Sequence, residues 1–224
     1  MAKHFTSLAE LPLPTVQSLL DRSQFFRSQT PAVLDQVLRH HVIANVFFEP
    51  STRTRVSFEM AAKRLGAEVI NFDPGNSSVK KGETLYDTLK TLESIGVDAL
   101  ILRHSDDRVF DTLSGLKVPM INAGAGKNEH PSQCLLDLLT LRQEFGNVAG
   151  LHILMAPRLG MRVTLAGPED MMPASLPVGC ERGGFDEALP TIDAVMCLRN
   201  QFERHEGLAL SPAEFHAQWG LTVA

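Results

Sequence analysis

The 224-residue sequence contains few cysteines, no long apolar run and no run of basic residues. Its three cysteines (Cys134, Cys180 and Cys197) are odd in number and far apart, which fits neither a disulfide framework nor a Cys-x-x-Cys zinc site. No apolar stretch is long enough to cross a bilayer, and the N-terminus lacks the apolar block of a secretory signal. The net charge of −5 gives no indication of a nucleic-acid-binding surface. We therefore expect a cytoplasmic protein that binds neither membrane nor nucleic acid.

Short apolar runs alternate with amphipathic stretches along most of the chain. The runs are rich in Val, Ile and Leu and show little alternation, which is typical of strands covered on both faces. The predicted strands are Val42–Phe48, Glu68–Phe72, Ala99–Leu102, Pro119–Ala123, His152–Met155, Arg162–Ala166 and Ala194–Leu198. Helices are predicted at Thr54–Leu65, Thr84–Ile95, His130–Phe145 and from Ser211, which has capping-box spacing to Glu214. This alternation predicts an α/β fold with a parallel sheet.

Each of the first three predicted helices has an apolar face that we expect to be buried. The expected buried residues are Phe58, Ala61, Ala62 and Leu65; then Leu85, Leu89, Leu92 and Ile95; then Cys134, Leu138, Leu141 and Phe145, with Leu135 and Leu139 beside them.

A small-residue stretch, Gly146–Gly150, marks the predicted boundary between two α/β units with a cleft between them. The connection that follows is unusual. Only six residues, APRLGM, separate two predicted strands, whereas a parallel crossover needs a dozen or more. Either these two strands are antiparallel or a crossover helix is missing.

Residues Ser51, Thr52, Arg53 and Thr54 stand where a strand gives way to a helix. A helix start offers unpaired backbone N–H groups and a partial positive charge, and the hydroxyl and guanidinium groups add further donors. The pattern predicts an anion site, with phosphate as the expected guest. The alternative is an ordinary N-cap followed by solvated arginines.

Three further polar clusters also lie next to predicted strand ends or helix starts. GNSSVKKGET (75–84) is either a phosphate-contacting loop or a solvated surface loop. Arg103-His104 follows an apolar strand and is weak evidence alone. His130 precedes a helix and could polarise a carbonyl group or cap the helix, and Gln133 could bind an amide. GAGK nearby lacks the spacing of a nucleotide-binding P-loop.

Five segments, taken together and in order, resemble the aspartate carbamoyltransferases of the aspartate/ornithine carbamoyltransferase family. They are FFEPSTRTRVSFE, SSVKKGETLYDT, LRH, NAGAGKNEHPSQCLLDL and LRNQFERH. The resemblance covers nearly the whole chain, and the first and fourth segments are its most specific parts. SSVKKGET and LRNQFERH favour the aspartate branch of the family over the ornithine branch.

The resemblance implies two doubly wound parallel-sheet domains. Residues 1–148 would form a carbamoyl-phosphate-binding domain lacking its closing helix, and 149–224 a truncated aspartate-binding domain. The implied reaction transfers the carbamoyl group of carbamoyl phosphate to L-aspartate, giving N-carbamoyl-L-aspartate and phosphate in de novo pyrimidine (UMP) biosynthesis. No cofactor or metal is implied. The implied assembly is a homotrimer with shared active sites. Whether regulatory or dihydroorotase-like subunits also bind is left open by the resemblance.

The resemblance also assigns roles to individual residues. The carbamoyl phosphate ligands it implies are Ser51, Thr52, Arg53, Thr54, Arg103, His130 and Gln133, with Ser77 and Lys81 reaching in from a neighbouring subunit. Of these, the catalytic residues would be Thr54, Arg103, His130 and Lys81. Aspartate would be bound by Arg199, Gln201 and Lys81.

Two parts of the family pattern are missing. The six-residue connection falls where the family has a Gly-Asp-x-x-x-Ser-Arg-x-x-x-Ser segment that opens a helix, and the chain stops before a His-Pro-Gly-Pro loop. We therefore expect weak binding of carbamoyl phosphate and poor turnover. The alternative function is that of a non-catalytic homologue that assembles with intact carbamoyltransferase subunits.

Overall fold

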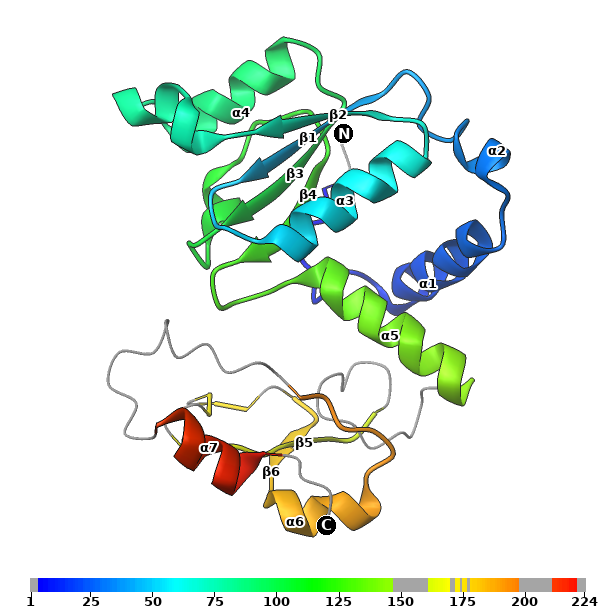
Figure 1. Cartoon of the computed structure of the whole chain (residues 1–224), viewed down its shortest axis with the longest axis vertical. Coiled ribbons are helices and arrows are strands. Elements are labelled where there is room, and N and C mark those ends of the chain that lie inside the picture. Colours follow the sequence, from blue (N-terminus) through cyan, green and yellow to red (C-terminus); the bar gives the residue numbers. More distant parts are fainter. Residues whose placement is uncertain are drawn as a thin grey trace. The chain divides into compact units, whose positions relative to one another are not determined.

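The computed structural model describes residues 4–146, 161–169, 172–173, 175–176, 178–197 and 211–220 (Figure 1). The chain divides into two compact units, Met1–Gln143 and Glu144–Ala224, which we describe separately. The predicted strand His152–Met155 and nearly all of the short connection after it lie outside the described residues. The functional roles assigned to the two domains stay predictions.

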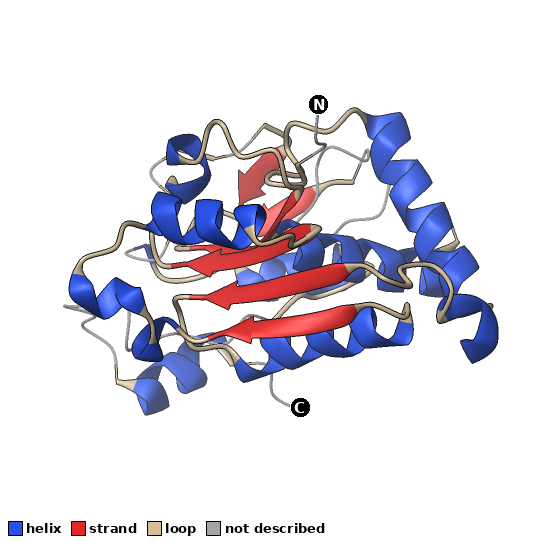
Figure 2. Ribbon diagram, turned by 90° about the horizontal axis from the view of Figure 1, so that it is seen from above, coloured by secondary structure: helices blue, strands red, loops and turns tan. Residues whose placement is uncertain are grey.

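The first unit is built on a four-stranded, wholly parallel sheet, whose strands are the red arrows that run side by side in Figure 2. The strand order is β2-β1-β3-β4. The strands are β1 (Val42–Phe47), β2 (Glu68–Phe72), β3 (Ala99–His104) and β4 (Met120–Ala125). All four correspond to predicted strands, with ends shifted by up to two residues. The expectation of an α/β fold with a parallel sheet is therefore confirmed.

The N-terminal segment extends this sheet, which the sequence did not predict. The N–H of Phe5 donates to the carbonyl of Met120 (2.8 Å), and the carbonyl of Phe5 accepts from the N–H of Asn122 (2.9 Å). These two bonds form a parallel bridge at β4. A single pairing residue has no periodicity, so no sequence pattern marks it.

The helices of the first unit lie between the strands and before them. They are α1 (Leu13–Arg27), α2 (Pro31–Leu34), α3 (Thr52–Arg64), α4 (Leu85–Ser94) and α5 (Pro131–Phe145), with 3₁₀ turns η1 (Pro74–Asn76), η2 (Ser78–Lys81) and η3 (Val109–Thr112). Helices α3, α4 and α5 were predicted. Helix α1 was not, because only Val16 and Leu20 in it are buried while Leu13 and Phe25 are exposed, which obscures an apolar stripe.

Helices α3 and α4 cover opposite faces of the sheet (Figure 1). Along β1, Ala44 and Val46 belong to the core cluster beside α4, whereas Ile43 and Phe47 belong to the cluster beside α3. This is the two-residue alternation of a strand. Both faces of the central strands are therefore buried, as their continuous apolar runs predicted.

Three helix residues expected in the core are exposed instead: Ala61, Ile95 and Phe145. Ile95 forms the C-cap of α4, beyond its last turn, and is 69% exposed. Phe145 is the last residue of α5. Ala61 lies outside the stripe of Phe58 and Ala62 by which α3 packs against the sheet. The helical period was right, but the width and length of the buried stripe were overestimated.

The strand order creates a topological switch point between β1 and β3. The chain leaves β1 for β2 on one side and then crosses to β3 on the other side. In open parallel sheets, the crevice at the carboxyl ends of two such strands is where ligands bind. This places the expected ligand site at the carboxyl ends of β1 and β3.

The second unit contains β5 (Val163–Leu165) paired in parallel with β6 (Cys180–Arg182), followed by α6 (Phe185–Ala188), η6 (Leu189–Thr191) and α7 (Pro212–Trp219). Strand β5 confirms the predicted strand at Arg162–Ala166, and the predicted capping box of Ser211 and Glu214 begins α7. Strand β6 was not predicted. The predicted strand Ala194–Leu198 is wrong over its described residues 194–197, where only Ala194 forms a bridge.

Candidate active site at the carboxyl ends of the sheet

Three of the predicted polar clusters meet at one edge of the first unit. Ser51–Thr54 follow β1, Arg103 is near the end of β3, and His130 and Gln133 follow β4. Because β1, β3 and β4 are adjacent and parallel, their carboxyl ends lie at the same edge. The fold thus brings together residues that are up to 82 positions apart, counted from Ser51 to Gln133 (133 minus 51).

Ser51 occupies the N-cap position of α3 with an extended backbone, but its side chain makes no capping hydrogen bond. The N–H of Arg55 already donates to the carbonyl of Ser51 (3.0 Å), so regular helical bonding begins at once. Thr54 is half-buried in the first turn, whereas Thr52 and Arg53 are exposed. The plain N-cap alternative is therefore disfavoured for Ser51, and its hydroxyl and the first-turn N–H groups suit an anionic ligand.

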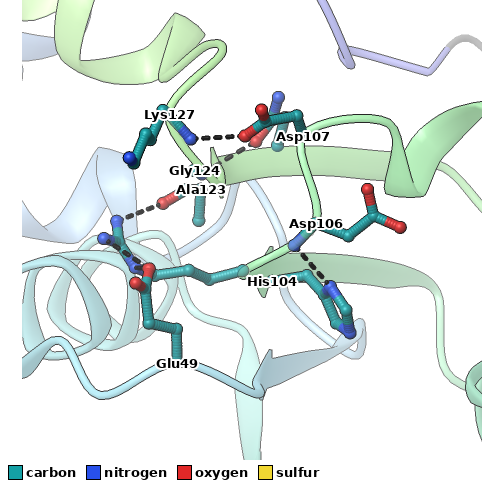
Figure 3. A network of polar contacts seen from close by, with 9 residues as sticks. Glu49, His104, Asp106, Asp107, Ala123, Gly124 and Lys127 are labelled. Carbon is teal, nitrogen blue, oxygen red and sulfur yellow. Dashed lines mark hydrogen bonds and ion pairs between the residues drawn. The ribbon is translucent and has the colours of Figure 1, made fainter. Parts of the chain in front are cut away.

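Arg103 is held on two sides near the end of β3. Its Nε and one terminal nitrogen donate to Oε2 of Glu49 (3.1 and 2.9 Å), and Nη1 donates to the carbonyl of Ala123 (3.0 Å; Figure 3). The side chains of Arg103 and Glu49 are only 13% and 16% exposed, so the ion pair is largely shielded from solvent. Burial lowers the pKa of the Arg103 guanidinium. The carboxylate of Glu49 offsets this burial and fixes the orientation of the cation.

His104, the next residue, serves a different purpose. Successive side chains of a strand point to opposite faces. The His104 ring lies 5.4 Å from the ring of Phe48, and its Nδ1 accepts from the N–H of Asp106 (3.0 Å; Figure 3). Burial lowers the pKa of His104, and the nearby Asp106 opposes that shift. Of the Arg103-His104 pair, only Arg103 belongs to the candidate site.

Glycines of the GAGK segment make room for this arrangement. A Cβ added to Gly124, whose φ is +125°, would lie 2.6 Å from Nη1 of Arg103. A Cβ added to Gly126 would lie 2.0 Å from Oδ1 of Asp107, which accepts from the N–H of Lys127 (2.6 Å; Figure 3). The segment therefore packs tightly around two charged side chains.

His130 both caps α5 and faces the site. Its Nδ1 accepts from the N–H of Gln133 (3.4 Å), so in the neutral ring the proton resides on Nε2. Burial lowers the pKa of His130, and the positive charge of nearby Arg103 lowers it further. The two alternatives for His130 are therefore compatible, because a neutral imidazole can cap with Nδ1 and donate a hydrogen bond with Nε2.

Gln133 and Cys134 lie in the first turn of α5. The Nε2 of Gln133 donates to Oδ1 of Asp137 (3.0 Å), which orients its amide so that Oε1 is the group suited to accept from a ligand. Burial raises the pKa of the Cys134 thiol to about 11. This thiol is therefore protonated at neutral pH and is a poor nucleophile.

The loop with Ser77 and Lys81 follows edge strand β2 and folds into η1 and η2. The hydroxyl of Ser77 donates to the carbonyl of Pro74 (3.0 Å) and accepts from the N–H of Val79 (3.3 Å). Lys81 is exposed. The bonds that Ser77 makes are thus local to the loop. Arg199 and Gln201, the predicted aspartate ligands, lie outside the described residues.

Several residues that shape the site were not singled out from the sequence: Glu49, Gly124, Asp107 and Glu129. Glu49 stands inside the FFEPSTRTR segment, and an acid next to two arginines could have suggested an ion pair. The partner that it takes, Arg103, is 54 residues away, and only the pairing of β1 with β3 reveals it.

Within the part of the chain that the structure describes, no group of three His, Cys, Asp or Glu side chains is arranged to hold a metal ion. None of the described helices combines the length and the apolar character needed to cross a membrane.

Comparisons with known proteins identify the family to which this fold belongs. The family model for the aspartate/ornithine carbamoyltransferase carbamoyl-P binding domain matches residues 3–143. The structure of aspartate transcarbamoylase from Trypanosoma cruzi in complex with carbamoyl aspartate and phosphate is 31% identical, with a TM-score of 0.80 over 91% of this chain and 73% of that chain.

Two further complexes of the Trypanosoma cruzi enzyme are similar to this chain. The complex with aspartate and phosphate is 30% identical, with a TM-score of 0.81 over 96% of this chain and 80% of that one. The complex with N-(phosphonacetyl)-L-aspartic acid is 31% identical, with a TM-score of 0.79 over 91% of this chain and 76% of that one. The chain belongs to the aspartate/ornithine carbamoyltransferase family and contains its carbamoyl-phosphate-binding domain.

Proposed function

We propose that this chain binds carbamoyl phosphate at the carboxyl ends of β1, β3 and β4 and transfers the carbamoyl group to L-aspartate. The products are N-carbamoyl-L-aspartate and phosphate, and the reaction belongs to pyrimidine biosynthesis in the cytoplasm. The observation that carries the proposal is the position of Arg103, a largely shielded cation held by Glu49 and Ala123 close enough to His130 to lower the pKa of that histidine.

The phosphate of the substrate would lie at the start of α3. The N–H groups of its first turn and the hydroxyls of Ser51 and Thr52 supply directional donors, and Arg53 supplies positive charge. The helix dipole favours a dianion there. Thr54 in the same turn would reach the carbonyl oxygen of the carbamoyl group.

The carbonyl oxygen would accept from Arg103 and from Nε2–H of neutral His130. The aspartate amine attacks the carbonyl carbon, the carbon–oxygen bond to phosphate breaks, and the phosphate departs with the electron pair. A proton of the amine passes to the departing phosphate. Donors fixed before the reaction stabilise the negative charge that develops on the carbonyl oxygen. Gln133 would accept from the carbamoyl amide through Oε1.

The aspartate half of the site and the assembly are also proposed from the family pattern. Arg199 and Gln201 would contact aspartate. Ser77 and Lys81 lie on the loop after the edge strand, and we propose that they complete the site of a neighbouring subunit in a homotrimer. The exposed ammonium of Lys81 supports this role.

Titration calorimetry with three ligands tests the two halves of the site separately. Inorganic phosphate probes the start of α3, carbamoyl phosphate adds the carbonyl and amide contacts, and N-(phosphonacetyl)-L-aspartic acid adds the aspartate moiety. We expect affinity to rise at each step. Formation of carbamoyl aspartate, with L-ornithine as the control amine, then tests the transfer itself. Absence of carbamoyl phosphate binding would contradict the proposal.

A second candidate function is that of a non-catalytic subunit that lends Ser77 and Lys81 to intact partners. The six-residue connection between two predicted strands favours it, because the family's aspartate-binding arginine belongs to the segment missing there. In that case phosphate and carbamoyl phosphate bind, the aspartate moiety adds no affinity, and no carbamoyl aspartate forms. Mixing this chain with an intact carbamoyltransferase subunit that lacks its own loop lysine would then restore activity.

A further inference from the structure

The N-terminal segment is tied to the sheet immediately beside the loop that carries His130. Besides the two backbone bonds of Phe5, Nδ2 of Asn122 donates to the carbonyl of Thr6 (2.8 Å) and the N–H of Met120 donates to Nδ1 of His4 (3.2 Å). Asn122 is 1% exposed, so its bond to Thr6 is well shielded. Residues 4–6 are thereby fixed along β4.

The carboxylate of Glu129 holds the next three residues of that segment. Oε1 accepts from the hydroxyl of Ser7 (3.0 Å), and Oε2 accepts from the N–H of Leu8 (3.3 Å). The N–H of Ala9 is shared between Oγ of Ser7 (3.1 Å) and Oε1 of Glu129 (3.4 Å). These residues are about 120 positions from Glu129 in the sequence. The carboxylate of Glu129 thus accepts hydrogen bonds from three donors of a distant segment. A solvated surface glutamate would instead be hydrogen-bonded mainly to water.

The loop is also held from its other side. Oδ1 of Asp107 accepts from the N–H of Lys127 (2.6 Å), and Nδ2 of Asn128 donates to the carbonyl of Asp107 (3.3 Å). The carbonyl of Glu129 accepts from the N–H of Ala125 (3.0 Å). Every residue from Lys127 to Glu129 therefore makes a bond that restricts it.

His130 is the next residue, and buried Pro131 follows it as the first residue of α5. The proline ring fixes one backbone dihedral and restricts the residue before it. With Glu129 anchored on one side and Pro131 on the other, the backbone of His130 has little freedom. Small displacements of a positioned donor are costly for binding and for catalysis.

We propose that Glu129 is a positioning residue, whose carboxylate locks the N-terminal segment Ser7–Ala9 to the loop and so fixes the direction in which His130 points at the carbamoyl phosphate site. The inference rests on the proposed function for its consequence, but the lock itself is a property of the described contacts. The N-terminal segment thereby becomes part of the scaffold of the site.

Three variants of the full chain test the lock. Glu129→Ala removes all three acceptor contacts. Glu129→Gln keeps Oε1 for Ser7 and Ala9 but places an N–H group opposite the N–H of Leu8. Ser7→Ala removes one partner. Glu10→Ala, which removes an exposed carboxylate from the same segment, is the matched control. Circular dichroism and thermal unfolding verify that each variant is folded.

The first readout is the pKa of His130 in the absence of ligand. It is measured from the NMR signals of the ring protons as the pH is varied. Arg103 is the charged group that faces this ring, and burial together with that charge lowers its pKa in the wild type. Removing the negative charge of Glu129 would by itself lower the pKa further. Release of the loop would instead hydrate the ring and raise it. We expect a rise in Glu129→Ala, a smaller rise in Glu129→Gln and none in Glu10→Ala.

The second readout is the affinity for carbamoyl phosphate. We expect Glu129→Ala to weaken it by roughly tenfold, the order of effect typical of losing a charge-assisted hydrogen bond. Ser7→Ala should have little further effect when added to Glu129→Ala, because both act through one contact. An unchanged or lowered pKa of His130 in folded Glu129→Ala would overturn the lock. If wild-type chain binds no carbamoyl phosphate but the pKa rises as expected, the lock stands and the proposed function fails.

Discussion

The two units of the chain differ in how much of each strand is enclosed. In the first unit, β1 and β3 are flanked by strands on both sides and by helices on both faces, and Ala44, Val46, Leu100 and Leu102 are fully buried. In the second unit, β5 and β6 have three residues each, and Met161, Val163 and Thr164 are the buried residues among those described. Val178 there is almost wholly exposed.

This difference in enclosure matters for the candidate site, whose described residues all lie in the first unit. A polar group can be held in a fixed direction only where the surrounding core is packed. Arg103 meets this condition, because a buried strand carries it and a glycine makes room for it. Arg182 in the second unit also forms an ion pair, with Glu169, but both side chains are considerably more exposed. The following comparisons test whether enclosure by the packed core is what holds a polar side chain in a fixed direction.

The largest expected effect is on stability. Leu100→Ala in the first unit empties a fully buried position and should cost about 2–5 kcal/mol of unfolding free energy. Leu189→Ala in the second unit removes a side chain that is 39% exposed and should cost about 1 kcal/mol or less. Denaturant unfolding of both variants measures the two values. Equal costs would show that the second unit is as well packed as the first.

The next effect concerns ligand affinity. Arg103→Ala should weaken carbamoyl phosphate binding by about a hundredfold, since a charged donor worth roughly 3 kcal/mol is removed and its ion pair with Glu49 is lost. Arg182→Ala, the matched control, removes an exposed ion pair and should leave affinity within a factor of two or so. Calorimetric titration checks both. If the two variants lost equal affinity, Arg103 would have no special role.

A smaller loss is expected for Gly124→Ala. The new methyl group would meet the Arg103 guanidinium, so the variant should lose roughly tenfold in affinity besides about 1 kcal/mol or more of stability from the positive φ. Gly96→Ala has a similar φ of +101° but nothing within 4 Å of the added methyl group. It should therefore lose stability and keep its affinity. Loss of affinity in both would mean that backbone strain alone is responsible.

The smallest effect concerns pH. Glu93 forms an ion pair with Lys90 and accepts from the N–H groups of Lys117 (2.5 Å) and Val118 (3.0 Å), which lowers its pKa to about 2. A carboxyl group whose pKa is lowered by folding stabilises the folded state at pH values above 4.5, the pKa of the unfolded chain. That stability is lost as the pH falls towards 2. Glu93→Gln should cost about 1 kcal/mol at pH 7 and flatten this acid dependence.

Glu214→Gln provides the comparison in the second unit. Hydrogen bonds from Ser211 lower the pKa of Glu214, with the same sign for the pH dependence, but the group is exposed at the start of α7. The change in the acid dependence of stability should therefore be smaller for Glu214→Gln than for Glu93→Gln. Unfolding curves between pH 2 and 7 measure both, and a larger acid effect for Glu214 would contradict the comparison.

Much of the fold of the first unit could be predicted from the sequence because its patterns are local. The apolar runs of β1 to β4 and the period of α4 each depend on residues close together in the chain, as does the capping box of Ser211 and Glu214 in the second unit. Strand β6, with the sequence Cys-Glu-Arg, and the bridge at Phe5 could not be predicted, since neither lies in an apolar run that marks a strand. The exposed Ile95 shows a related limit, because the extent of a buried face depends on what packs against it.

For the candidate site, the residue types and their positions were determined by the sequence alone: hydroxyls and arginines at the start of α3, Arg103 near the end of a strand, and His130 before a proline-led helix. The tertiary structure decided which of these side chains lie close to one another at the site. It separated Arg103 from His104 by strand alternation, gave Arg103 its partner Glu49, and joined Glu129 to the N-terminal segment. Those pairings depend on strand order, which brings distant residues together through packing that no local pattern records.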